Sequence, residues 1–170
     1  MASSTSTPTF PSIVPPDEAT RSRAAQLRTT APTSAGIPAG SLGRLEDVAT
    51  WIASCQGSAP ATPLDAARLI LVTGEHGVAE AHPEISALPT DFNAQVIQAL
   101  ADATAPVVDA CRAARVSLSI VDATLGKPSA PIDTADALTP EEYDKHLARG
   151  MRFADEEADK GTAVLLLGDL

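Results

Sequence analysis

Residues 68–74 read RLILVTG, a continuous apolar run bounded by an arginine and a glycine. Apolar residues at successive positions over this length predict a strand that is covered on both faces, as the strands of parallel sheets are. Two more runs of this kind follow, SLSIV at 117–121 and AVLLLGD at 163–169. The sequence therefore predicts a sheet of about three strands.

Helical patterns separate these strands. Residues 91–103 and 105–115 carry apolar residues at helical spacing between the first two strands. Before the third strand, Thr139 and Glu142 form a capping-box pattern, and Gly161 closes the helix that follows. The apolar stripe of this helix is Tyr143, Leu147, Met151, Ala154 and Ala158, and we expect its acidic side to be solvated. Strands alternating with helices predict an α/β fold with a Rossmann-like parallel sheet.

The chain before the first strand has a different composition. Residues 1–16 are rich in Ser, Thr and Pro, which predicts a disordered tail. Residues 17–60 predict amino-terminal helices, of which the second starts at a Ser41 N-cap and ends at Gly57. Residues 61–170 then form a partial α/β domain.

Charge and motifs exclude several classes of function. The formal net charge of −10 and pI of about 4.6 disfavour nucleic acid and anionic membranes as partners. No signal-peptide pattern or membrane-length apolar stretch is present, so we expect a cytoplasmic protein. Motifs for dinucleotides, P-loop ATP binding and serine hydrolysis are absent, and we expect no cofactor. The spacing of His76 and His82 is not that of a zinc site. We expect Cys55 and Cys111 to be buried as small apolar side chains, so we expect no metal site.

Each predicted strand ends on an acid. These are Glu75, Asp122 and Asp169. Ligands of parallel sheets bind beyond the carboxyl ends of the strands, so three acids at one edge indicate a binding site. The alternative is that the acids only cap the turns that follow the strands.

Several segments resemble one enzyme family in order and spacing. IPAGSLGRLEDVATWIA at 37–53 is similar to the opening signature of the nicotinate-nucleotide dimethylbenzimidazole phosphoribosyltransferases, K-P-x-G-S-L-G-x-L-E. GEHGVAEAHPEISALPTDFNAQVIQAL at 74–100 resembles their G-D-H-G-V block and the segment after it, and residues 136–170 resemble a later helix and strand. The resemblance covers residues 25–170. Ile37, Glu75 and Asn93 depart from the usual lysine, aspartate and threonine of the family.

The resemblance implies a glycosyltransferase of the pentosyltransferase type, acting in cobalamin lower-ligand synthesis. Such an enzyme transfers phosphoribose from nicotinate mononucleotide to 5,6-dimethylbenzimidazole, which gives α-ribazole 5'-phosphate. Carried over residue by residue, it implies that Ser86 and Leu88 line the benzimidazole pocket, with Val96 one helical turn beyond. It also implies that Glu75 with His76, and Asp169, lie on the substrate side. The alternative for Ser86, Leu88 and Val96 is a loop serine and two core aliphatic residues.

The resemblance further implies that the phosphate-cradling loop and the catalytic base of the family follow the segment matched here. We therefore expect a truncated chain that is inactive alone, with no catalytic residue of its own. Two alternatives stay open: a non-catalytic module that binds an aromatic base or a partner chain, and an artefact of gene calling. A short parallel sheet also has an open edge, which predicts a homo-oligomer.

Overall fold

The computed structural model describes residues 9–30, 38, 40–123 and 127–170. The chain divides into two compact units, Met1–Pro63 and Leu64–Leu170. In the first unit, helix α1 (Glu18–Thr30) packs against helix α2 (Arg44–Gln56). The Arg28 guanidinium lies 2.9 Å from the Glu46 carboxylate and joins the two helices.

Two predictions for the first unit are wrong in detail. Helix α2 begins at Arg44 with Gly43 as its N-cap at φ 51°, and Ser41 donates its hydroxyl to the Pro38 carbonyl instead. A positive φ suits glycine, which explains why the helix begins there. Gly57 does end the helix, in the left-handed conformation. Cys55 is exposed, although Cys111 in the second unit is buried as predicted.

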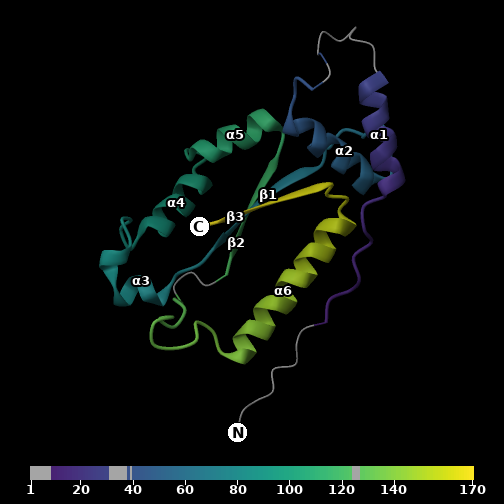
Figure 1. The fold of residues 1–170 in the computed structure, drawn as a ribbon. Coiled ribbons are helices and arrows are strands. Elements are labelled where there is room, and N and C mark those ends of the chain that lie inside the picture. Colours follow the sequence, from purple (N-terminus) through teal and green to yellow (C-terminus); the bar gives the residue numbers. More distant parts are fainter. Residues whose placement is uncertain (1–8, 31–37, 39, 124–126) are drawn as a thin grey trace. The chain divides into compact units, whose positions relative to one another are not determined.

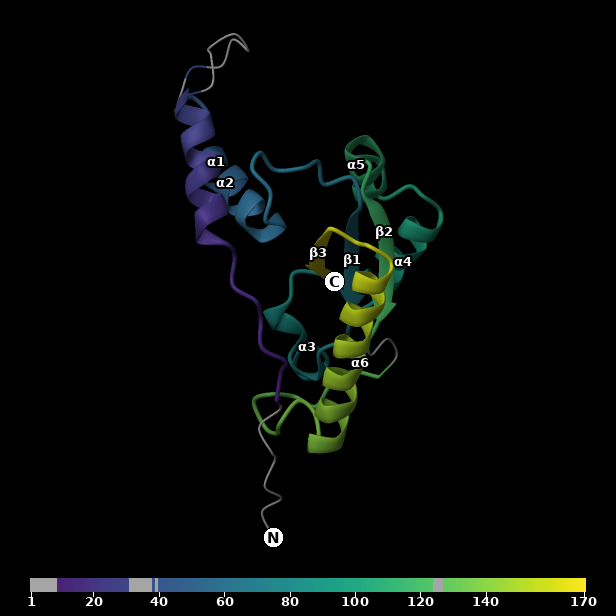
Figure 2. The same cartoon turned by 90° about the vertical axis from the view of Figure 1, so that its right-hand side faces the viewer.

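The second unit contains the predicted parallel sheet. Strand β1 (Ala67–Thr73) lies between β2 (Ser117–Asp122) and β3 (Val164–Asp169), and both pairings are parallel. Figure 2 shows the three strands side by side with β1 in the middle. The α/β fold expected from alternating strands and helices is confirmed. Parallel pairing places the carboxyl ends of all three strands at one edge of the sheet.

Helices flank both faces of this sheet. Helices α4 (Phe92–Ala101) and α5 (Pro106–Ala114) lie on one side and α6 (Pro140–Asp159) lies on the other (Figures 1 and 2). The short helix α3 (Gly77–Ala81) and the 3-10 helix η2 (Pro83–Ile85) follow β1; the sequence patterns did not predict them. The buried apolar side chains of this unit are Ile70, Leu100, Ala105 and Cys111. None of the helices in the described ranges has the length and apolar character needed to cross a bilayer.

Helix α6 begins with the predicted capping box. Thr139 accepts a hydrogen bond from the Glu142 amide, and the Glu142 carboxylate accepts one from the Thr139 amide at 2.9 Å. The predicted apolar stripe is only partly covered, because Tyr143 is 48% exposed and Met151 is 39% exposed.

The prediction of a solvated acidic side on α6 is wrong at Glu157, which is fully buried. Its carboxylate accepts hydrogen bonds at 2.9 Å from Lys160 Nζ and from Thr162 Oγ1, and it lies 3.4 Å from Arg68 Nε of β1. The hydrogen bond from Lys160, followed by that from Thr162, lowers the pKa of Glu157 and keeps it ionised. This cluster fastens the carboxyl-terminal part of α6 to the sheet.

Candidate functional site

A pocket of about 790 Å³ lies at the carboxyl edge of the sheet. Its walls come from the loop after β1, from α3 and η2, from the start of α4, and from Pro128 and Leu170. We call it the carboxyl-edge pocket. Its volume falls in the range of about 300–1,000 Å³ that is typical of sites for small molecules.

Backbone hydrogen bonds fix the floor of this pocket. The Gly74 amide donates to the Leu170 carbonyl at 3.2 Å, and the Leu170 amide donates to the Val72 carbonyl at 3.0 Å. The Ala123 amide, just after β2, donates to the Thr73 carbonyl at 2.9 Å. The ends of the three strands are therefore held together where the pocket begins.

The loop that carries Glu75 and His76 is held by a close approach of two backbone segments. The Ser129 amide donates to the Glu75 carbonyl at 3.0 Å. Gly77 lies so near this segment that a Cβ atom placed on it would overlap the Ser129 carbonyl oxygen. Only glycine fits at this position, for a reason of space rather than of backbone conformation.

Asn93 ties the start of α4 to the end of β1. Its side-chain amide donates to the Gly74 carbonyl at 2.9 Å, and Asn93 also lines the pocket. The sequence singled out Asn93 only as a departure from the threonine of the resembling family. No local sequence signal indicates this contact, because Asn93 and Gly74 are 19 residues apart and meet only in the folded chain.

Four of the predicted site residues come together in this pocket: Glu75, His76, Ser86 and Leu88. The Glu75 side chain is half-buried and His76 is exposed. The Ser86 hydroxyl accepts a hydrogen bond from the Leu88 amide at 3.2 Å, which shapes the turn that presents Leu88. The pocket therefore combines a carboxylate and an imidazole with apolar walls, an arrangement suited to a flat ligand with polar atoms at its rim.

The other three predicted residues lie outside this pocket's lining. Val96 is half-buried in α4, one turn beyond Asn93. Asp122 is paired in register with Thr73, whereas Asp169 is paired with Val72. Because side chains alternate along a strand, this offset points Asp122 and Asp169 to opposite faces of the sheet.

A second polar cluster lies beyond η2. His82 Nε2 is 2.9 Å from an Asp133 carboxylate oxygen, and the hydrogen bond to His82 lowers the pKa of Asp133. His82 Nδ1 is also 3.5 Å from the Glu84 carboxylate. Within the described ranges, no three or more His, Cys, Asp or Glu side chains gather in a way that could hold a metal ion.

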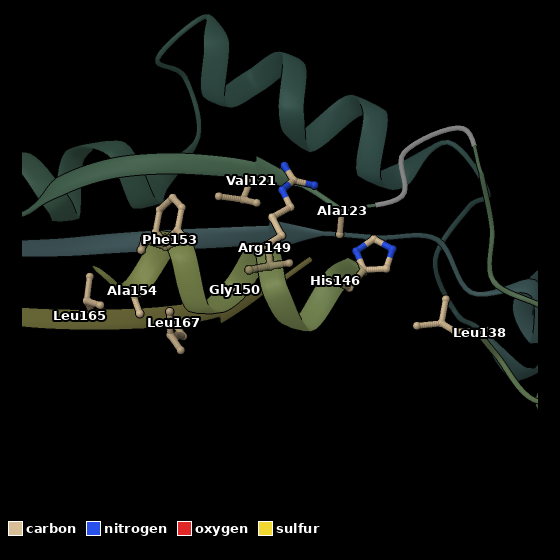
Figure 3. Close-up of a pocket in the computed structure, with 12 residues that line it drawn as sticks. Val121, Ala123, Leu138, His146, Arg149, Gly150, Phe153, Ala154, Leu165 and Leu167 are labelled. Carbon is tan, nitrogen blue, oxygen red and sulfur yellow. The ribbon is translucent and has the colours of Figure 1, made fainter. Parts of the chain in front are cut away.

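A second cavity, of about 450 Å³, lies between α6 and the sheet (Figure 3). We call it the sheet–helix cavity. Its walls are apolar side chains of all three strands together with Phe153 and Ala154 of α6, and His146 and Arg149 stand at one end. Arg149 donates to the Asp122 carbonyl at 2.8 Å, so its guanidinium is held at the end of β2.

Comparison with known proteins identifies the family. A family model described as phosphoribosyltransferase (DBI_PRT) matches residues 13–170, which is most of the chain. This chain belongs to that phosphoribosyltransferase family. Its relatives include the nicotinate-nucleotide–dimethylbenzimidazole phosphoribosyltransferase of Corynebacterium efficiens, 39% identical over 143 residues, which cover 78% of this chain and 38% of the relative. The enzyme of the same name from Mycolicibacterium paratuberculosis is 37% identical over 177 residues, covering 95% of this chain and 48% of the relative.

A solved structure shows the same phosphoribosyltransferase fold. The nicotinate-nucleotide–dimethylbenzimidazole phosphoribosyltransferase of Thermus thermophilus superposes with a TM-score of 0.76 at 24% identity, covering 91% of this chain and 49% of that one. The chain thus spans about half the length of the phosphoribosyltransferases that it matches. The resemblance seen in the sequence is confirmed at the level of family and fold. The departing residue Ile37 lies outside the described residues.

Proposed function

We propose that this chain forms the base-binding part of a phosphoribosyltransferase that transfers phosphoribose from nicotinate mononucleotide to 5,6-dimethylbenzimidazole. One observation carries the proposal: in a chain of this family, Glu75, His76, Ser86 and Leu88 line a single pocket at the carboxyl edge of the sheet. We assign the benzimidazole to that pocket. The Leu88 and Phe92 side chains supply apolar surface for a flat ring, and Ser86 and Asn93 supply polar atoms for its nitrogens.

The chemistry of the transfer agrees with the charges near this pocket. When a ring nitrogen attacks the anomeric carbon, the bond from that carbon to nicotinate breaks and nicotinate leaves with the electron pair. Positive charge develops on the ribose during this exchange, and a nearby carboxylate stabilises it. Glu75 is the carboxylate that lines the pocket directly after β1. The attacking ring must also lose a proton to a base. We do not assign that base to a residue of this chain, and we propose that the 170-residue polypeptide alone binds the ring without turning it over.

The first test is a calorimetric titration of the 170-residue chain with 5,6-dimethylbenzimidazole. Leu88 is 53% exposed, so Leu88→Ala is expected to fold and to weaken binding by about three- to thirtyfold through lost apolar contact. Ile85→Ala is the matched control, because Ile85 is 59% exposed and is not among the residues lining the pocket. Absence of binding by the unaltered chain, or equal weakening by both substitutions, contradicts the proposed site.

The second test separates binding from turnover. The chain is incubated with nicotinate mononucleotide and 5,6-dimethylbenzimidazole, and α-ribazole phosphate is detected by chromatography. We expect no product from the chain alone. Turnover on the order of 1 per second, which is typical of enzymes, would show that all catalytic groups are present here.

A further inference from the structure

The wall of the carboxyl-edge pocket ends in a short irregular stretch. Residues 83–88, which we call the pocket rim, comprise η2 and the turn after it, and three of them line the pocket. The Ile85 amide donates to the His82 carbonyl at 3.1 Å. The Ser86 amide donates to the Pro83 carbonyl at 3.3 Å. A single 3-10 turn is not stable by itself, because so few hydrogen bonds do not offset the conformational entropy lost when its backbone is fixed. The rim therefore needs a contact from elsewhere in the chain to keep one position.

His82 supplies such a contact. It is the C-cap of α3 and directly precedes the rim, and its ring Nε2 lies 2.9 Å from a carboxylate oxygen of Asp133, 51 residues further along the chain. Figures 1 and 2 show the segment before α6 lying beside α3. Neither His82 nor Asp133 is among the residues that line the pocket, so the pair holds the rim from outside. We call this pair the His82–Asp133 clamp.

The segment that carries Asp133 is itself held in place. It closes on itself, since the Ala130 amide donates to the Ala137 carbonyl at 3.0 Å. It is also joined to the loop after β1, because the Ser129 amide donates to the Glu75 carbonyl. Asp133 is therefore a fixed point to which His82 attaches the rim.

The charges around the His82 ring favour its protonated form. In the part of the chain that the structure describes, two carboxylates face the ring: Asp133 at Nε2, and Glu84 of η2 at 3.5 Å from Nδ1. Glu80 of α3 lines the pocket instead. A neutral imidazole has one N–H group and donates to one carboxylate, whereas a protonated imidazole donates to both. The hydrogen bond with His82 lowers the pKa of Asp133 below its ordinary value of 3.8, so Asp133 is ionised throughout the range of pH 5 to 8 in which histidines change charge.

We propose that the His82–Asp133 clamp positions the pocket rim, so that the pocket binds its flat ligand more tightly when the clamp is intact and when His82 is protonated. Binding needs the form in which Ser86 and Leu88 stand at the wall, and the apparent dissociation constant rises as that form becomes less populated. His82 acts through the rim and touches no ligand, so it is a positioning residue. The identity of the ligand rests on the proposed function, whereas the order of the rim does not.

The order of the rim is measured first, on the chain without ligand. Nitrogen-15 NMR relaxation gives order parameters for the Ser86 and Leu88 amides, which are about 0.85 in a rigid backbone and below about 0.6 in a flexible one. We expect both values to fall toward the flexible range in His82→Ala and in Asp133→Ala. They should stay unchanged in His82→Gln, whose side-chain amide donates to Asp133 in place of Nε2. Values that are the same in all four chains, or that fall as far in His82→Gln as in His82→Ala, overturn the proposal.

Calorimetric titration with 5,6-dimethylbenzimidazole then measures the affinity. We expect His82→Ala and Asp133→Ala each to weaken binding about two- to tenfold, and the double variant to weaken it no further, because either substitution breaks the same contact. His146→Ala and Asp136→Ala are the matched controls, since they remove the same residue types at positions that do not line the carboxyl-edge pocket. Unchanged affinity in the clamp variants, additive losses in the double variant, or equal weakening by the controls overturns the proposal.

A pH comparison tests the charge of His82. The ligand and His76 of the pocket are titratable as well, so the quantity compared is the ratio of the affinities of the unaltered chain and His82→Gln, in which their contributions cancel. Because the pair is partly exposed, we expect this ratio to be only about two- to fivefold larger at about pH 5.5 than at about pH 8. A ratio that does not change with pH overturns the proposal. If the unaltered chain binds no 5,6-dimethylbenzimidazole, the proposed function fails, and the NMR order parameters still decide whether the clamp holds the rim.

Discussion

Replacing Gly77 by alanine tests whether the loop of the carboxyl-edge pocket depends on a close backbone approach. The added Cβ would overlap the Ser129 carbonyl oxygen and lie 3.1 Å from the Ser129 carbonyl carbon and 3.2 Å from that of Ala130. All three atoms are backbone atoms, so no side-chain rotation relieves the overlap. The two segments must separate, and the hydrogen bond from the Ser129 amide to the Glu75 carbonyl is then lost.

The size of the effect follows from these contacts. Forced overpacking costs about 1–3 kcal/mol, and a lost hydrogen bond costs about 0.5–1.5 kcal/mol. We therefore expect Gly77→Ala to lower the free energy of unfolding by about 2–4 kcal/mol. Because Glu75 and His76 move with the loop, binding of 5,6-dimethylbenzimidazole is expected to weaken as well.

Gly150→Ala is the matched control, because it is the same substitution but is expected to change the free energy of unfolding in the opposite direction. Gly150 lies within α6, and a Cβ there meets no atom within 4 Å. Alanine is the better helix former by about 0.8–1 kcal/mol, so this variant is expected to be more stable. Urea denaturation followed by far-ultraviolet circular dichroism measures both. A Gly77→Ala chain as stable as the unaltered one would refute the close approach on which the loop geometry depends.

Three further predictions concern stability. Thr139→Ala removes the cap of α6 and is expected to lower the free energy of unfolding in urea by about 0.5–2 kcal/mol. The Thr139 backbone amide, which Thr139→Ala retains, lowers the pKa of Glu142, so the stabilisation by the ionised carboxylate is present above the unfolded value of 4.5 and the melting temperatures of both chains should fall as pH drops through the lower folded value. Glu157→Gln is expected to melt at a lower temperature at pH 7, and because Lys160 lowers the pKa of Glu157, this difference should shrink below pH 4.5. Ile70→Ala is expected to lower the free energy of unfolding, measured in urea, by about 2–5 kcal/mol, because Ile70 is only 2% exposed in the central strand.

The elements that the sequence predicted best are those with local signals. Helix α6 has its capping box and first-turn proline within four residues, and β1 contains the uninterrupted apolar run LILV at 69–72. Helix α3 has only five residues and ends just before the His82–Pro83 pair, so it shows no full helical period. The start of α2 was misplaced because a serine is the usual N-cap, whereas here a positive φ at Gly43 sets the boundary.

The helical periodicity of the sequence could not predict which charged side chain of α6 is buried. Glu157 belongs to the acidic side of α6 by spacing, yet it is fully buried. Its partners include Arg68, which is far away along the chain and reaches it only once β1 lies beside α6. A pattern within one helix carries no information about such a partner.

The candidate site was predictable where its residues follow one strand. Glu75, His76, Ser86 and Leu88 all belong to the connection after β1, so their grouping needs only a correct strand end. Pro128 and Leu170 join the pocket from distant parts of the chain, and nothing in their local sequence indicates this.

The faces of the sheet on which Asp122 and Asp169 lie depend on the register with which β2 and β3 pair with β1. Both follow strand patterns of equal quality, but their pairing with β1 differs by one residue, which sends them to opposite faces. Asp169 pairs with Val72, so it lies on the same face of the sheet as Leu165 and Leu167, which line the sheet–helix cavity. The place of Asp169 in a substrate site therefore depends on the register of β3 against β1 rather than on the residues around it in the sequence.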